Sequence, residues 1–190
     1  MSDPVVALVL AAGQARRFGS DKRWARLPDG RSLLDAVIET ARLAGLPVHV
    51  VLRPGDEAGA ACCARQGAQP VWAAAAGQGM GASLAAGLRQ LTDRTDAEAA
   101  VVMLADMPWV QPETVRALCA AFARERGLTW PWHQGQPGHP RLLPRAQWPA
   151  LLDLGGDEGA RGLDWARATR VVVADAGVLR DVDVPQDLQG

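Results

Sequence analysis

Cysteine is scarce in this chain, and long apolar runs are missing. The 190 residues include three cysteines, of which Cys62 and Cys63 are adjacent and Cys119 stands alone. This arrangement excludes a disulfide framework and lacks the ligand spacing of a zinc site. We therefore interpret all three as small apolar core residues in a reducing compartment. No run of about 18 apolar residues occurs, which excludes a membrane-spanning helix.

An excess of positive charge is missing as well. The chain has 20 basic and 21 acidic residues and a formal net charge of -1. A nucleic-acid-binding face normally makes a chain basic, so we expect no nucleic-acid partner. Residues 1–4 contain no basic residue ahead of the apolar run 5–10, and that run is too short for a signal peptide. We expect a cytoplasmic protein with no membrane partner.

Strand-like and helix-like segments alternate along most of the chain, which is typical of βαβ units and a mostly parallel sheet. A length of 190 residues fits one α/β domain. The expected strands are 5–10, 47–52, 71–72, 99–105 and 171–173, and the expected helices are 33–41, 56–65, 83–91, a segment from Pro112 and 160–168. Beyond about residue 126 the pattern is irregular, and we interpret it as an elaboration over the ligand edge of the sheet.

The loop that follows the first strand, residues 10–22, fits neither of two familiar phosphate-binding patterns. A Walker loop needs lysine directly after its second glycine, but two residues separate Gly19 from Lys22. The dinucleotide fingerprint is broken immediately after Gly13. The loop therefore needs an interpretation of its own.

Small residues begin this loop and cations end it. Ala11, Ala12 and Gly13 have little side chain, so a base and a ribose can lie against their main chain. Arg17 and Lys22 are spaced to bind a triphosphate, and loop N–H groups can form an anion-binding nest. The combination predicts a nucleotide site; the alternative is a strand–turn with solvated cations.

Acidic residues occur where two further segments end. Asp106 follows the apolar strand 99–105, at the end of a strand where open α/β sheets bind ligands. Asp181 and Asp183 alternate along an extended segment before Pro185, so they point the same way. Carboxylates from distant regions that meet at a phosphate site predict Mg²⁺, with either Asp181 or Asp183 as the second ligand. Alternatively, Asp106 caps a turn and Asp183 caps the following helix.

Two loops, a histidine and a group of tryptophans are weaker candidates. The glycine loop 79–83 opens a helix, whose N–H groups can bind an anion or a base edge. Asp157 caps the next helix or, together with Arg161, faces the phosphate of an acceptor substrate. His139 is either solvated or in contact with substrate. The tryptophans between residues 130 and 148 are interpreted as packing residues, although a flat heterocyclic substrate would suit them.

Together these segments resemble MobA-like nucleotidyltransferases, in particular molybdenum cofactor cytidylyltransferases. The similar blocks keep the family's order along nearly the whole chain: 10–22, 79–84, 104–108, 138–140, 156–161 and 181–185. Ala15 and Trp109 depart from the family pattern, which has serine and a smaller aliphatic residue there. The resemblance implies one Rossmann-like three-layer α/β/α domain of the nucleotide-diphospho-sugar transferase type over 1–190. Within it, about 1–110 would bind the nucleotide and about 127–165 the acceptor.

The activity that the resemblance implies is transfer of CMP from CTP to the phosphate of a molybdopterin-type molybdenum cofactor, with pyrophosphate released. Ala12 matches the cytidylyl version, because guanylyl members tend to carry glycine there. The implied catalytic residues are Lys22, Arg17 and Asp106. The implied nucleotide-binding residues are Leu10, Ala11, Ala12, Gly13, Gly19, Lys22, Gly79 and Ser83. The implied Mg²⁺ ligands are Asp106 and Asp183, and the implied acceptor-binding residues are His139, Asp157 and Arg161.

Two alternatives stay open from the sequence. One is the same chemistry with GTP as donor, or with a sugar or alcohol phosphate as acceptor. The other is a non-catalytic protein that binds the cofactor and delivers it to an apo-molybdoenzyme or its chaperone. Neither the acceptor nor the oligomeric state follows from the residues.

Overall fold

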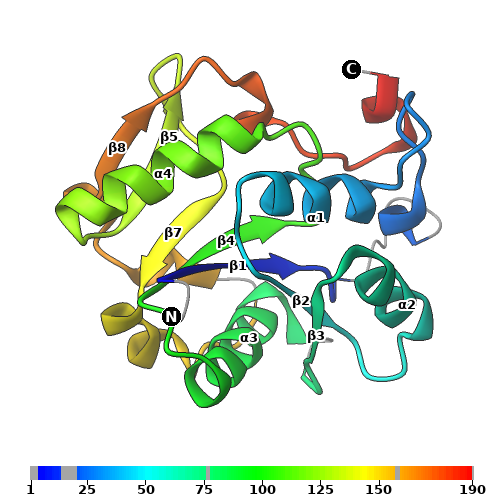
Figure 1. The fold of residues 1–190 in the computed structure, drawn as a ribbon, viewed down its shortest axis with the longest axis horizontal. Helices are drawn as coiled ribbons and strands as arrows, with labels where there is room; N and C mark the ends of the chain where they lie inside the picture. The colour runs from blue at the N-terminus through cyan, green and yellow to red at the C-terminus, as the bar shows by residue number, and fades with distance from the viewer. Residues whose placement is uncertain (1–3, 14–20, 76–77, 157–158, 190) are drawn as a thin grey trace.

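The computed structural model describes residues 4–13, 21–75, 78–156 and 159–189, which form a mixed sheet flanked by helices (Figure 1). The strands are β1 (Val5–Leu10), β2 (Val48–Leu52), β3 (Gln69–Trp72), β4 (Ala99–Leu104), β5 (Thr129–His133), β6 (Gln136–Pro137), β7 (Arg141–Pro144) and β8 (Thr169–Val172). The α-helices are α1 (Leu33–Leu43), α2 (Glu57–Gln66), α3 (Met80–Arg94) and α4 (Pro112–Glu125). Short 3₁₀ helices are η1 (Lys22–Trp24), η3 (Arg145–Leu151), η4 (Gly159–Gly162), η5 (Trp165–Arg167), η6 (Ala176–Leu179) and η7 (Pro185–Gln189).

Parallel strands form the first half of the sheet. The strand order is β3-β2-β1-β4-β7-β5-β6, and β8 pairs with β5. β1 lies parallel to both β2 and β4, with Leu10 opposite Leu104 in the second pair. The N–H of Ala105 donates to the Leu10 carbonyl oxygen at 3.2 Å. The loops that follow β1 and β4 therefore leave the same edge of the sheet side by side.

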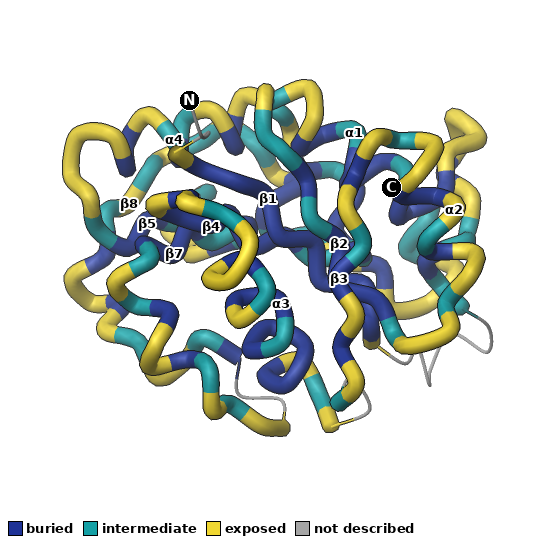
Figure 2. Tube along the Cα trace, turned by 60° about the horizontal axis from the view of Figure 1, so that its bottom comes forward, coloured by how far each residue is buried: buried dark blue, intermediate teal, exposed yellow. Residues whose placement is uncertain are grey.

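Helices cover both faces of this sheet, which explains why β1 and β4 are apolar at every position. Ala7 and Val9 pack on the face covered by α1, α2 and α4. Leu8 packs on the opposite face with α3 and with Trp148 and Trp165. Figure 2 shows the central strands as buried segments between partly exposed helices. The predicted three-layer α/β/α architecture with a mostly parallel sheet is confirmed. No helix in the described ranges is long and apolar enough to cross a membrane.

The second half of the sheet differs from the expectation. The segment after residue 126 was expected to be irregular, and this prediction was wrong. Its strands β5, β6 and β7 extend the same sheet, with β7 antiparallel to β4. These strands are short and interrupted by prolines, which hides the strand period. The helix expected at 160–168 is replaced by the separate 3₁₀ turns η4 and η5, because Ala160, with a ψ of +18°, and Asp164, with a ψ of +76°, do not have helical backbone angles. The helix expected from residue 83 begins at Met80.

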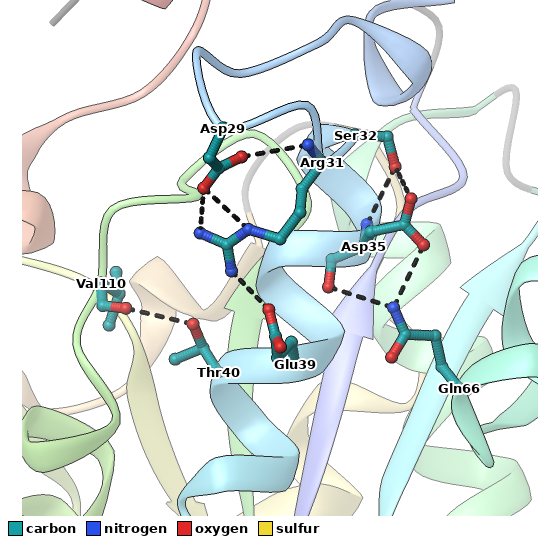
Figure 3. A network of polar contacts seen from close by, with 8 residues as sticks. All are labelled: Asp29, Arg31, Ser32, Asp35, Glu39, Thr40, Gln66 and Val110. Atoms are coloured by element: carbon teal, nitrogen blue, oxygen red, sulfur yellow. Dashed lines mark hydrogen bonds and ion pairs between the residues drawn. The ribbon is translucent and has the colours of Figure 1, made fainter.

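A polar network joins the first turn of α1 to α2 (Figure 3). The Ser32 hydroxyl accepts from the N–H of Asp35 at 3.1 Å and donates to its carboxylate at 2.6 Å. Gln66 Nε2 donates to Asp35 Oδ1 at 3.1 Å, and the Cys62 thiol donates to the same oxygen at 3.3 Å. Burial opposes the charge of Asp35, but the hydrogen bonds outweigh it and hold the pKa of Asp35 at about 2.

This pKa makes the contribution of Asp35 depend on pH. The pKa is lower in the folded chain than the value of about 3.9 expected in the unfolded chain, so the carboxylate stabilises the fold above pH ~4. The stabilisation falls as the pH approaches 2, and about half should be lost by pH ~3. We expect Asp35→Asn to lower the free energy of unfolding by about 2 kcal/mol at pH 7 and by about half as much near pH 3.

Urea unfolding at both pH values measures this difference. Asp93→Asn, at an exposed position on α3, is the control and should match the unsubstituted chain. The prediction would be contradicted if Asp35→Asn lowered the free energy of unfolding by the same amount at both pH values.

Candidate active site

Segments far apart in the sequence meet at the carboxyl edge of the parallel strands. Lys22 begins η1, Asp106 follows β4, and Asp183 lies in the extended segment after η6. Lys22 Nζ is 2.7 Å from Asp106 Oδ2 and 3.6 Å from Asp183 Oδ1. It also donates to the carbonyl oxygen of Val182 at 2.9 Å. The structure thus brings together the lysine and both acids that the sequence pointed to as ligands for a phosphate and a metal.

Backbone hydrogen bonds fasten the C-terminal segment across this edge. The N–H of Val182 donates to the Asp106 carbonyl oxygen at 2.8 Å. The N–H of His139, just before β7, donates to the Val178 carbonyl oxygen at 2.9 Å. Asp175 accepts the backbone N–H that precedes α4 at 2.8 Å. The position of Asp183 therefore depends on contacts with β4, β7 and α4.

The turn after Asp183 is capped by another acid. Asp187 Oδ2 accepts the N–H groups of Asp183 and Val184 at 2.8 and 2.9 Å. These hydrogen bonds lower the pKa of Asp187. The side chain of Asp183 is left to face Lys22. Among the described residues, Asp106 and Asp183 are the carboxylates within 4.0 Å of Lys22 Nζ, and Asp181 is not.

The position between Asp106 and Asp183 suits a cation. Both carboxylates are partly exposed, at 26% and 56% of the side chain, and both contact one ammonium group. Within the described ranges no cluster of three His, Cys, Asp or Glu residues could hold a metal ion. Mg²⁺ commonly binds one or two carboxylates and completes its shell with phosphate oxygens and water. The donor set fits a divalent cation that binds together with a phosphate.

Arg23, which the sequence did not single out, is the buried charge of this region. It is 5% exposed. Its guanidinium lies 2.5 Å from Asp21 Oδ2 and 2.5 Å from Asp56 Oδ2, and it donates to the Ala11 carbonyl oxygen at 2.9 Å. Asp56 also caps α2 by accepting the N–H of Gly59. Arg23 therefore ties the end of β1 and the start of η1 to the N-terminus of α2.

Electrostatics hold this group in its charged form. Burial works to lower the pKa of Arg23, but the hydrogen bonds and charges of Asp21 and Asp56 outweigh it and raise that pKa. The hydrogen bond from Arg23 in turn lowers the pKa of Asp21. Periodicity carries no signal for such an interaction, because the partners are distant in sequence and meet only in the fold.

The small residues after β1 are not equally open. Ala11 and Ala12 are 2% and 1% exposed, and Leu10 is 9% exposed. Ala12 packs on the α3 face of the sheet. Gly13 is exposed, and a Cβ added there would meet no atom of the described residues within 4 Å. Gly13 is thus the residue of the group whose backbone a ligand can approach directly.

The glycine loop before α3 is covered by another segment. Gly79, with a φ of +111°, is the N-cap of α3. The N–H of Gly81 donates to the Gly156 carbonyl oxygen at 2.8 Å, and a Cβ at Gly81 would lie 2.8 Å from Gly155. Ser83 is 3% exposed, and its hydroxyl donates to the Gly79 carbonyl oxygen at 3.3 Å. In this structure, segment 155–156 occupies the hydrogen-bonding position that the sequence suggested for a ligand.

Two of the proposed acceptor residues are described: His139 lies just before β7, and Arg161 lies in η4. His139 Nδ1 is buried and has no hydrogen-bond partner among the described residues. Burial, with a smaller effect from Arg141, lowers the pKa of His139 to about 4, so the ring is neutral at pH 7. Arg161 is exposed in η4. Arg17, Gly19 and Asp157 lie outside the described residues.

Comparison of the sequence with models of known protein families identifies the family of this chain. The model for the MobA-like NTP transferase domain matches residues 7–171. This chain belongs to the MobA-like NTP transferase family. The match covers both halves of the sheet and every described candidate residue except Asp181 and Asp183.

One curated relative and two solved structures are similar to this MobA-like chain. It is 30% identical over 122 residues to a "Probable molybdenum cofactor guanylyltransferase" from Geobacillus sp. (strain WCH70), covering 64% of this chain and 60% of that protein. The crystal structure of Rv0371c from Mycobacterium tuberculosis H37Rv has a TM-score of 0.83 at 27% identity, over 100% of this chain and 97% of that one. A manganese complex of Rv0371c has a TM-score of 0.71 at 26% identity, over 97% and 92%.

Arg23 gives a direct test of how this MobA-like site is held. We expect Arg23→Ala to lower the free energy of unfolding by about 3–5 kcal/mol, because the Asp56 side chain, 8% exposed, loses its counter-charge. Arg23→Lys should lose less, since it keeps the charge but not the planar fork that reaches three groups. Urea unfolding followed by circular dichroism measures both.

Arg124→Ala, at an exposed position on α4, is the control, and we expect it to change stability by less than about 0.5 kcal/mol. If Arg23→Ala is as stable as this control, the buried ion network does not hold the site.

Proposed function

We propose that this chain is a nucleotidyltransferase, which transfers a nucleoside monophosphate from a nucleoside triphosphate to a phosphorylated acceptor and releases pyrophosphate. The observation that carries the proposal is the meeting of Lys22, Asp106 and Asp183 at the carboxyl edge of the sheet. Ligands bind at this edge in open α/β sheets. Membership of the MobA-like NTP transferase family supports the reaction class.

CTP is the proposed donor, and GTP is the alternative. CTP is supported by Ala12, since guanylyl members of the family tend to carry glycine there. The side chain of Ala12 is buried against the α3 layer. Its influence on the base would therefore act through the course of the backbone at Gly13. The curated relative, whose name is that of a guanylyltransferase, favours GTP.

A molybdopterin-type molybdenum cofactor is the proposed acceptor. The name of the curated relative supports it. His139, Asp157 and Arg161, within the segment 127–165, are proposed to contact it. The recipient of the product would be an apo-molybdoenzyme or its chaperone.

Transfer of this kind needs positioning and charge neutralisation more than covalent chemistry by the protein. An oxygen of the acceptor phosphate attacks the α-phosphorus in line with the departing pyrophosphate. The acceptor phosphate is already ionised near pH 7, so no general base is needed. Lys22 and Arg17 are proposed to neutralise the triphosphate. Bound to Asp106 and Asp183, Mg²⁺ would neutralise charge on the α-phosphate and the leaving group.

Pyrophosphate release from CTP, GTP or ATP in the presence of purified molybdopterin cofactor tests the proposal. We expect release to require Mg²⁺ and to be fastest with CTP. Lys22→Ala and Asp106→Asn should each lower kcat by at least ~100-fold, because each removes a charge that acts on the reacting phosphates. Circular dichroism should show an unchanged fold.

Asp153→Asn, at a fully exposed side chain, is the control and should keep full activity. Full activity in both site variants would refute the mechanism. Tight cofactor binding with no pyrophosphate release from any nucleotide would instead identify a delivery protein.

The contacts of Lys22 also predict how the free protein binds metal. Its ammonium lies between the carboxylates that a divalent cation would use, so the two cations compete. We expect Lys22→Met to bind Mn²⁺ in the absence of nucleotide with an affinity roughly 10-fold higher than the unsubstituted chain, as for the loss of one partly buried ion pair. Electron paramagnetic resonance of free Mn²⁺ measures this affinity.

Lys22→Arg keeps the competing charge and should bind Mn²⁺ as weakly as the unsubstituted chain. Asp106→Asn should bind it more weakly still. Equal Mn²⁺ affinities for Lys22→Met and the unsubstituted chain would place the metal elsewhere.

A further inference from the structure

The segment that leads to Asp183 lies directly against the loop that follows β4. A Cβ built at Gly177 in η6 would lie 2.2 Å from the Trp109 carbonyl oxygen and 2.8 Å from the Val110 nitrogen. Both atoms belong to the backbone, which cannot move aside as the end of a flexible side chain can. Gly177 therefore lets the main chains of the two segments touch, and a larger residue would push them apart.

Asp175 fastens the start of the same segment. Its Oδ2 accepts the backbone N–H of Gln111 at 2.8 Å and the Thr114 hydroxyl at 2.7 Å. Its Oδ1 accepts the N–H of Gly177 at 2.9 Å. The segment is therefore held at the start of α4 before it continues toward Asp106.

Between this attachment and Asp183, one side chain reaches back to the loop after β4. Arg180 Cζ lies 4.0 Å from the centroid of the Trp109 ring. A cation at this distance is attracted by the indole ring, and a planar guanidinium can also stack on it. The hydrogen bonds from Val184 and Asp183 lower the pKa of Asp187, and the charge of Arg180 lowers it further. Arg180 therefore stands close to the turn that Asp187 caps.

The Trp109 side chain also packs on the interior of the site. It lies against a small apolar cluster that consists of Leu27, Leu33, Ala36 and Val182. The backbone of Val182 donates to the Asp106 carbonyl oxygen and accepts from Lys22 Nζ. One indole therefore contacts both the core beneath the C-terminal segment and the guanidinium of Arg180.

The contact with Lys22 by itself holds Asp183 weakly. The side chain of Asp183 is 56% exposed and lies 3.6 Å from Lys22 Nζ, and exposed ion pairs of this kind contribute little. When a metal ion takes the place of that ammonium, as proposed above, the contact is lost. The contact between Trp109 and Arg180 does not involve Lys22, so it can hold the segment in both situations.

We propose that Trp109 and Arg180 are positioning residues, which hold Asp183 at the separation from Asp106 at which both carboxylates bind one divalent cation. This role rests on the proposed function, in which the two acids are the metal ligands. Indole and guanidinium groups only donate hydrogen bonds, so neither residue is itself a ligand. Residues that support metal ligands in this way commonly change metal affinity by about 10- to 100-fold.

Trp109→Leu tests the proposal, because it removes the ring and keeps every charge of the site. We expect this variant of the full chain to bind Mn²⁺, without nucleotide, about 10-fold more weakly than the unsubstituted chain. Trp109→Phe keeps a ring for Arg180 and should lose less. Electron paramagnetic resonance of free Mn²⁺ measures the affinities, and urea unfolding checks that each variant is folded.

Phe122→Leu is the matched control. Arg126 Cζ lies 5.2 Å from the Phe122 ring, near the end of α4 that is away from Asp106. The substitution removes a buried ring beside a guanidinium and should lower stability, but it should leave Mn²⁺ affinity unchanged. Equal Mn²⁺ affinities for Phe122→Leu and Trp109→Leu would overturn the proposal.

Arg180→Met distinguishes positioning from simple repulsion between charges. Removal of a nearby cation favours Mn²⁺, so an Arg180 that acted only through its charge would give tighter binding in this variant. Loss of the stack on Trp109 predicts weaker binding instead. Arg180→Lys keeps a cation beside the ring and should bind Mn²⁺ almost as well as the unsubstituted chain. Tighter Mn²⁺ binding by Arg180→Met would overturn the proposal.

Pyrophosphate release separates this role from the function itself. Trp109→Leu should need about 10-fold more Mg²⁺ for half-maximal release, with an unchanged KM for the acceptor. If the unsubstituted chain releases pyrophosphate but Mn²⁺ affinity does not depend on Trp109, only the positioning role fails. If Mn²⁺ affinity depends on Trp109 but no nucleotide gives release, the transferase proposal fails.

Discussion

One ammonium group joins the parts of the candidate active site. Lys22 Nζ contacts the loop after β4 and two consecutive residues of the C-terminal segment, through Asp106, Val182 and Asp183. Without a cation between them, the two carboxylates would repel each other. Val182 is fully buried and fastens the segment by its backbone as well. The edge of the sheet is therefore built around a position that must hold positive charge.

Arg23, which follows Lys22 in the sequence, differs from it in burial and in the number of its partners. It is buried, and its two carboxylate partners and the Ala11 carbonyl oxygen engage its whole fork. The side chains of Lys22 and of its two carboxylate partners are partly exposed, so another cation can take its place at modest cost. Arg23 thus anchors the loop, while Lys22, its neighbour in sequence, makes the more exposed contacts that the proposed binding of a metal and a triphosphate would rearrange.

The two halves of the sheet contribute different parts of the proposed site. The parallel strands bring Asp106 and the start of the loop after β1 to one edge, while β5 and β7 carry buried donors that have no hydrogen-bond partner among the described residues. The hydrogen bond between His139 and Val178 ties the second half to the C-terminal segment that positions Asp183. A chain with a net charge of -1 can therefore still offer a local positive surface to two anionic substrates.

By itself the sequence determined the α/β class, the parallel strands and the candidate pair of Lys22 and Asp106, because apolar strands and the residues that end them are local patterns. The meeting of Lys22 with Asp183, the anchoring by Arg23 and the gathering of donors around Trp130 were decided by the tertiary structure. Prolines and short strands hide the period of β5 and β7, so their place in the sheet follows only from pairing with β4. Contacts between charges distant in sequence leave no period at all, since they exist only once the sheet has brought those segments together.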